Sequence, residues 1–220
     1  MEFLRVEISA MTASFRYPMF VVSYQPTYPV PPVSTMYGLL SAVKGSKVHL
    51  DEIKIGYIFE SRGKGTDLER IYEYGIGDAT KKPVHRLGTN IVQREFLYDC
   101  TLTMYLSDVR FGKYFMNPAY SLLLGRQPDL AYVKKIESVN LEKRDDVVIN
   151  HTMIPFTGEI PGQVISLPSD FTDTAERKPL QVKAYTIITT PQCISNGYFD
   201  TDTGTGVYIH DFTSAGKTER

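Results

Sequence analysis

The chain has no tryptophan, only two cysteines and no long apolar run. Cys100 and Cys193 do not form a Cys-x-x-Cys pair, and two cysteines are too few for a disulfide framework, so we expect two buried or partly buried thiols. No stretch is long and apolar enough to span a bilayer, and residues 1–7 lack the basic start and apolar run of a signal peptide. We therefore expect a cytoplasmic protein with no membrane partner.

Metal and nucleotide motifs are also scarce. The sequence has no Gly-x-Ser-x-Gly elbow, and a glycine-rich stretch at 202–206 fits a turn between strands better than a phosphate-binding loop. Asp145 and Asp146 are adjacent, so on a strand they would point to opposite faces. The histidines show no metal-ligand spacing; they are His49, His85, His151 and His210. The sequence thus predicts no cofactor and no metal.

The net charge of −1 argues against a protein that binds nucleic acid through its overall charge, but a local basic surface could still bind RNA. The 220 residues include 15 tyrosines and 11 phenylalanines, which supply many flat rings for a core or for stacking on bases. This length supports one large domain, or one domain with a small appendage.

Periodicity predicts an α+β fold. Alternating apolar residues indicate strands at Phe3–Ser9, 53–59, 101–106 and 131–139. A stiff proline cluster at 26–32 leads into a helix at Ser34–Lys44, with Ser34 or Thr35 as its cap and Gly45 just past its end. Asn117-Pro118 predicts the start of a second helix that Gly125 closes.

In order, these elements form a ferredoxin-like or RRM-like βαββαβ pattern over residues 1–140. Residues 61–100 are an insertion rich in glycine and basic side chains, which fits either a functional arm or a solvated loop. Residues 141–220 are predicted to be a smaller β-rich C-terminal extension with strands near 147–149, 163–167, 180–189 and 207–209.

Three segments suggest a binding role. In the first, Arg16 lies between Phe15 and Tyr17 and offers a phosphate fork beside stacking surfaces, although ordinary packing is the more frequent explanation of such a triplet. The second is the rigid loop that leads into the helix at Ser34, where free N–H groups favour an anion; simple capping is the alternative. Gly38 inside this helix suggests close approach of another backbone. The third segment, 117–126, ends in Arg126 at an outward turn.

Together, Pro-Pro-Val-Ser-Thr-Met-Tyr-Gly, the preceding Phe-Arg-x-Pro and the later Leu-x-Leu-Gly-Arg resemble the "Cas five" family of the RAMP superfamily. This family supplies the subunit that caps the 5′ handle of the crRNA in type I CRISPR Cascade complexes. The resemblance spans Phe3 to Arg126 and implies a ferredoxin-like domain whose inserted arm is a β-hairpin thumb. It also implies RNA contacts, which we expect at Arg16, Tyr28, Ser34, Thr35, Tyr37 and Arg126, and on the thumb at Lys81, Lys82, His85, Arg86 and Arg94.

The partners that the resemblance implies are the crRNA, the repeated backbone subunit and the large subunit of the complex, with target DNA reached only through that complex. The expected function is non-catalytic capping, because base pairing along the guide reads the sequence. An alternative is a metal-independent endoribonuclease that processes precursor crRNA, since His85 lies near Lys81 and Lys82 with Tyr72 and Tyr74 upstream. A second alternative is a structural adaptor that holds two proteins without touching RNA.

Overall fold

A computed structural model describes residues 1–20, 23–74 and 86–213. Antiparallel strands dominate it, and its helical elements are α1 (Val33–Lys44), a 3-10 turn at Val109–Phe111 and α2 (Gly112–Met116). The α+β class expected from periodicity is therefore confirmed. The strands are β1 (Glu2–Ala13), β2 (Tyr24–Gln25), β3 (Ile55–Tyr74), β4 (Arg86–Leu106), β5 (Leu122–Leu123), β6 (Leu130–Arg144), β7 (Val147–Ile149), β8 (Thr152–Pro155), β9 (Gln163–Phe171), β10 (Pro179–Ile188), β11 (Gln192–Ile194), β12 (Gly197–Asp200), β13 (Thr205–Val207) and β14 (Ile209–His210).

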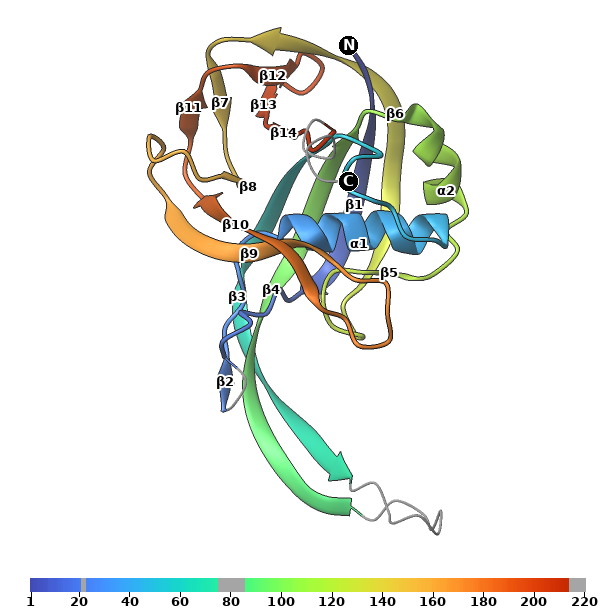
Figure 1. Ribbon diagram of the computed structural model, residues 1–220, viewed down its shortest axis with the longest axis vertical. Coiled ribbons are helices and arrows are strands. Elements are labelled where there is room, and N and C mark those ends of the chain that lie inside the picture. Colours follow the sequence, from blue (N-terminus) through green and yellow to red (C-terminus); the bar gives the residue numbers. More distant parts are fainter. Residues whose placement is uncertain (21–22, 75–85, 214–220) are drawn as a thin grey trace.

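The main sheet runs in the order β13-β12-β6-β1-β4-β3-β14, with β2 added to β4 and β5 added to β6. Each of its four central strands is antiparallel to its neighbours, and β1 pairs with β4 on one side and β6 on the other. In chain order, α1 connects β1 to β3 by way of β2, and α2 lies between β4 and β6. Figure 1 shows α1 lying across one face of this sheet, with the β9–β10 hairpin beside it.

Helix α1 begins and ends close to the predicted positions. Its apolar stripe, which includes Met36, Leu40 and Val43, is buried in the main core against the sheet. Gly45 takes the left-handed conformation (φ 79°) that ends the helix, as predicted. The predicted cap is wrong: Pro32 is the N-cap residue, no side chain caps the helix, and Ser34 and Thr35 lie inside its first turn.

The second helix is not where the sequence analysis placed it. The chain forms the 3-10 turn and α2 at 109–116. Asn117 is the C-cap residue of α2, whereas the prediction placed it at the start of a helix. The actual start signal is Asp108, whose carboxylate accepts a hydrogen bond from the backbone N–H of Arg110 at 2.9 Å. Pro118 therefore follows a helix end, which is the other common place for proline.

The insertion at 61–100 is regular where the structure describes it. Strands β3 and β4 continue out of the sheet as one hairpin, from the pair Ser61↔Cys100 to the pair Tyr74↔Arg86. Figure 1 shows this hairpin, which we call the arm, projecting from the body. Tyr98 and Phe96 lie close over Gly63 and Gly65. A Cβ on Gly63 would be 2.6 Å from the hydroxyl oxygen of Tyr98, and a Cβ on Gly65 would be 2.8 Å from the ring of Phe96.

The C-terminal residues are mostly strand, as expected, and several of these strands join the main sheet. Strands β12 and β13 extend it beyond β6, and β14 pairs with β3 at the opposite edge. Strands β8, β10 and β9 form a separate small sheet, and Leu167 and Tyr185 on it pack into the main core. The division at residue 140 stays a prediction. Cys100 is buried, as expected, but the expectation of a buried or partly buried thiol is wrong for Cys193, which is exposed.

Candidate nucleic-acid interface

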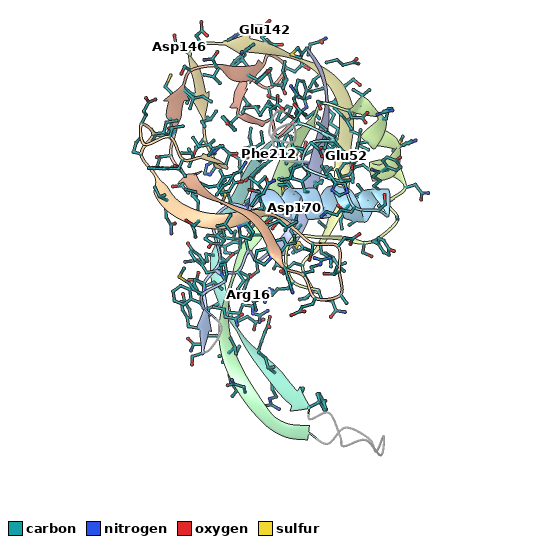
Figure 2. The ribbon with its side chains drawn as sticks, in the orientation of Figure 1. Arg16, Glu52, Glu142, Asp146, Asp170 and Phe212 are labelled. Carbon is teal, nitrogen blue, oxygen red and sulfur yellow. The ribbon has the colours of Figure 1, made fainter. Side chains whose placement is uncertain are left out.

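A cleft of about 1490 Å³ opens where the body meets the arm. Three elements form its walls: the exposed side of α1, the arm on one flank, and the turn of the β9–β10 hairpin on the other. The loop after β1, which carries Arg16, and the turn between β5 and β6 complete the lining. Figure 2 shows Arg16 at the junction of body and arm.

Small and hydroxylated residues form the α1 wall, including Ser34, Thr35, Gly38 and Ser41. No side chain caps α1, and the N–H groups of Thr35 and Met36 donate to the carbonyl oxygen of Pro32 at 2.9 and 3.3 Å. The N–H groups of Val33 and Ser34 are too near the start of the helix to have an intrahelical partner. The expected close approach of another backbone to Gly38 does not occur among the residues that the structure describes, since none of their atoms lies within 4 Å of a Cβ built there. Gly38 instead leaves the middle of this wall bare, so a ligand can approach the helix backbone closely.

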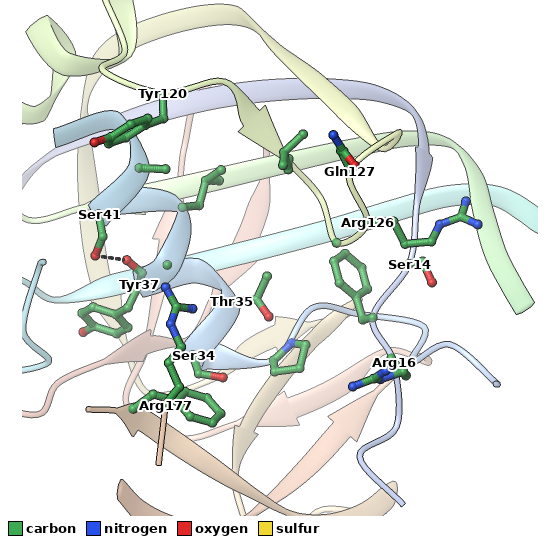
Figure 3. A pocket seen from close by; sticks show the side chains of 18 of the residues that line it. Ser14, Arg16, Ser34, Thr35, Tyr37, Ser41, Tyr120, Arg126, Gln127 and Arg177 are labelled. Atoms are coloured by element: carbon green, nitrogen blue, oxygen red, sulfur yellow. Dashed lines mark hydrogen bonds between the residues drawn. The ribbon is translucent and has the colours of Figure 1, made fainter. Parts of the chain in front are cut away.

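Three arginines with exposed side chains line this cleft, namely Arg16, Arg70 and Arg177. None of them has an ion-pair partner among the residues that the structure describes. Figure 3 shows Arg16 and Arg177 on opposite sides of Ser34 and Thr35. A planar guanidinium with free N–H groups suits bidentate contact with a phosphate. Sequence reasoning identified Arg16 only.

Arg70 and Arg177 were missed for different reasons. Arg70 was one of many basic residues in the insertion, and no motif distinguished it. Arg177 lies in the β9–β10 turn, more than 130 residues after α1 in the sequence, and tertiary packing of β9 against α1 brings it to the cleft. No local pattern in the sequence indicates such a position.

The other basic residues of the cleft are held in ion pairs. Lys47 contacts Asp170 at 3.1 Å, and Arg94 contacts Glu69 at 3.1 Å. Arg126 has the most partners: its guanidinium contacts Asp129 at 3.0 Å and Glu69 at 2.6 Å. Burial lowers the pKa of Arg126, but the hydrogen bonds to these two carboxylates outweigh burial and raise it overall. Arg126 stays an expected RNA contact, although its side chain is only 11 % exposed.

Two expected aromatic contacts lie in the core. Tyr28 has no exposed surface, and Tyr17 covers its ring at a centroid distance of 3.6 Å. Tyr37 is buried too, and its hydroxyl donates to the backbone oxygen of Ile53 at 2.8 Å. In this structure neither ring is available for a base to stack on, because core packing occupies both. Burial accordingly raises the pKa of both hydroxyls.

The remaining expected sites are only partly placed. Lys81, Lys82 and His85 lie outside the described residues. Arg86 is the first residue of β4, where it pairs with Tyr74 in the hairpin. Among the described residues no cluster of histidine, cysteine or carboxylate side chains could hold a metal ion, and no described helix is long and apolar enough to cross a membrane.

The cleft is therefore polar and mixed in charge. Unpaired guanidiniums, hydroxyl groups and the first turn of α1 face one space, while carboxylates such as Asp67 and Asp173 line it too. Such a lining can bind an extended anionic chain through separate phosphates, and its carboxylates can accept hydrogen bonds from base amino groups.

Comparisons with known proteins give information on the fold. No family model and no curated protein matches the sequence. Solved structures do match. A chain of a CRISPR RNA-guided surveillance complex aligns with a TM-score of 0.52 at 15% identity, covering 89% of this chain and 91% of that chain. The protein has the fold of a CRISPR complex subunit.

A second match comes from the Type III-B Cmr-beta complex bound to cognate target RNA. It has a TM-score of 0.51 at 13% identity and covers 85% of both chains. The resemblance to subunits of CRISPR complexes that the motifs suggested is thereby confirmed for the fold. At these identities the match carries no information on individual residues, so the role of the cleft must be argued from its own chemistry.

Proposed function

We propose that the protein is a non-catalytic RNA-binding subunit of a type I CRISPR RNA-guided complex and that it caps the 5′ handle of the crRNA. The observation that carries this proposal is the cleft, where Arg16, Arg70 and Arg177 present unpaired guanidiniums around the uncapped start of α1. We further propose that β6, β1, β4 and β3, with α1 and α2, are a ferredoxin-like core of the RAMP type.

In the proposed mechanism the handle backbone lies along the exposed side of α1. Arg16 and Arg177 flank the first turn of α1 and neutralise adjacent phosphates, while Ser34 and Thr35 donate hydroxyl hydrogen bonds. The bare surface at Gly38 lets the RNA backbone approach the helix closely. The arm then separates the handle from the guide, because it projects from the same junction at which the cleft opens.

The proposed partners are the crRNA, the backbone subunit and the large subunit, with target DNA reached through the complex. The outer part of the arm supports a protein partner, since Leu68, Ile71 and Ile91 expose apolar side chains there. A subunit that covered this surface would remove it from water and also hold the arm in place.

The test is to purify the tagged protein from its host, identify the co-purified proteins by native mass spectrometry, and sequence the bound RNA. We expect a stoichiometric set of CRISPR subunits and RNAs that share one short 5′ handle. The double variant Arg16→Ala/Arg177→Ala should lose the RNA. The matched control is Arg110→Ala/Arg144→Ala, because both of these arginines are paired with nearby carboxylates and neither lines the cleft. Recovery of the protein without RNA would overturn the proposal.

Nuclease activity is the main competing function. It stays an alternative because the side chains that metal-free cleavage needs are present near one another in the sequence: His85 would supply the base, and Lys81 and Lys82 the cation. Incubating the protein with a repeat RNA distinguishes the two functions: a binding subunit leaves the RNA intact, whereas a nuclease cuts it and loses this activity in His85→Ala.

A further inference from the structure

Arg126 joins the body of the protein to the arm. It belongs to the turn between β5 and β6, but Figure 3 shows its side chain directed away from α1. On the body side its Nε and Nη2 donate to the two carboxylate oxygens of Asp129, both at 3.0 Å. On the arm side its Nη1 donates to Oε1 of Glu69 at 2.6 Å. A single guanidinium therefore bridges a turn of the body and a strand of the arm.

The bridge is buried and rigidly supported. Asp129 has no exposed surface, and it also accepts a hydrogen bond from the hydroxyl of Thr12 on β1 at 2.6 Å. The backbone N–H of Arg126 donates to the same carboxylate at 2.9 Å, and the guanidinium lies 5.7 Å from the ring centroid of Phe96. A planar fork that is fixed on both sides leaves little hydrogen-bonding capacity for an incoming phosphate.

The position of Glu69 gives this bridge its mechanical importance. Going outward along the arm, the pairing of β1 with β4 ends at Ala13↔Leu97, and the pairing of β2 with β4 ends at Tyr24↔Gln93. Glu69 pairs with Val92, one step further along the arm. Beyond it, the described arm residues pair in strand register only with one another. The contact from Arg126 is thus made at the base of the free part of the arm.

Glu95 anchors the arm nearer its root and does not duplicate the bridge. This buried carboxylate accepts hydrogen bonds from the hydroxyl of Tyr24 and from the backbone N–H of Thr27, the latter at 3.1 Å. It also contacts Lys64 at 2.7 Å. Burial raises the pKa of Glu95, but these donors outweigh burial and lower it overall, so the anchor stays ionised. It holds the loop after β1 to the arm, whereas Arg126 holds the β5–β6 turn.

We infer that Arg126 is a positioning residue that sets the direction of the arm relative to the cleft and does not itself bind RNA. This inference rests on the proposed function only where it concerns RNA; the arm's direction is a property of the free protein. It replaces the direct phosphate contact that the sequence resemblance implied for Arg126. In a capping subunit, the angle of the arm would decide where the handle turns away from the guide.

Two variants isolate the bridge without unfolding the turn. Arg126→Lys keeps the positive charge beside Asp129, but a single ammonium cannot contact Asp129 in two places and Glu69 at the same time. Glu69→Gln leaves the Arg126–Asp129 pair intact and weakens both the link of Arg126 to the arm and the Arg94–Glu69 pair. The control is Arg94→Lys, which alters an ion pair within the arm, since Arg94 contacts Glu69 from the neighbouring strand.

The experiment measures distances between spin labels by electron–electron resonance in the free protein. The labels are placed at Asn90→Cys on the arm and Glu142→Cys on the body, in a Cys193→Ser background. We expect a narrow distance distribution for the parent and for Arg94→Lys, and a broadened or shifted one for Arg126→Lys and Glu69→Gln. An unchanged distribution in both bridge variants would overturn the inference.

RNA binding supplies the second readout. If Arg126 positions the arm, Arg126→Ala weakens binding of the handle RNA but leaves the slope of log affinity against log salt unchanged. A lost phosphate contact would reduce that slope by about 0.7, and this result would restore Arg126 as an RNA-binding residue. If the parent binds no RNA but the bridge variants still loosen the arm, the proposed function fails and the positioning role stands.

Discussion

The backbone of Gly125 lies directly against that of Ser14: a Cβ added to Gly125 would be 1.9 Å from the carbonyl oxygen of Ser14. The same glycine has a φ of 123°, where side chains are strained. We therefore expect Gly125→Ala to lower the free energy of unfolding by about 3 kcal/mol or more. Urea unfolding followed by circular dichroism measures the change.

Gly38→Ala is the matched control for this substitution. Gly38 lies within α1 and nothing would contact its Cβ, so alanine should raise the stability by about 1 kcal/mol. If Gly125→Ala proved as stable as the parent, the close approach of the β5–β6 turn to the loop after β1 would be contradicted.

The difference between α1 and α2 shows what local sequence can predict. Around α1 every signal agrees: prolines stop the preceding chain, apolar residues repeat at helical spacing, and Gly45 ends the helix. Around α2 the signals conflict, because Asn-Pro fits both the start of a helix and the residues after one. With only five residues, α2 has too short a periodic stretch to resolve this ambiguity.

The cleft was less predictable than the helix beside it. The motif around Arg16 and Ser34 could be located from the sequence because it is local. The pairing of Arg126 with Glu69 joins positions 57 residues apart, so no local pattern distinguishes this arginine from an outward-facing one. Likewise, the burial of Tyr28 follows from Tyr17 lying over its ring, a contact that only the folded loop creates.

The unpaired arginines predict a specific salt dependence of RNA binding. Arg16→Ala and Arg177→Ala should each weaken binding of a handle RNA and reduce the slope of log affinity against log salt by about 0.7, because each removes one phosphate contact. Fluorescence anisotropy over a series of salt concentrations measures both quantities. Arg144→Ala is the control, since this arginine pairs with Glu142 outside the cleft. Equal slopes for all variants would exclude these contacts.

His210 predicts a loss of stability in mild acid. The ring is buried between Tyr57 and Phe212, and neither nitrogen has a hydrogen-bond partner among the described residues. Burial lowers the pKa of His210 from 6.5 to about 4. Between these two pKa values the unfolded chain binds a proton that the folded chain does not bind. The contribution of His210 to the free energy of unfolding is therefore present above pH 6.5, and about 3 kcal/mol of it is lost as the pH falls towards 4.

His210→Phe isolates this effect, because phenylalanine retains the ring stack but cannot be protonated. We expect the variant to lose less stability than the parent between pH 6.5 and 4.5 in urea unfolding. Carboxylates with lowered pKa, such as Asp200, destabilise both proteins equally as the pH falls, so the difference reports on His210 alone. Parallel pH profiles would show that the folded protein accommodates the charged ring.

The exposed apolar side chains on the arm predict self-association of the free protein. Leu68 is 66% exposed and Ile91 is 59% exposed, on adjacent strands of a projecting hairpin. An exposed apolar surface of this kind favours association, and in the absence of a partner subunit we expect it to bind a second copy of the protein. Sedimentation velocity should show weight-average mass rising with concentration, and Leu68→Lys/Ile91→Lys should suppress the rise. Leu130→Lys, at a 60% exposed position in β6 of the body, should leave the rise in mass unchanged.

A parent protein that stays monomeric at every concentration would mean that the arm needs no apolar partner. Its contacts in the complex would then be sought among its charged residues.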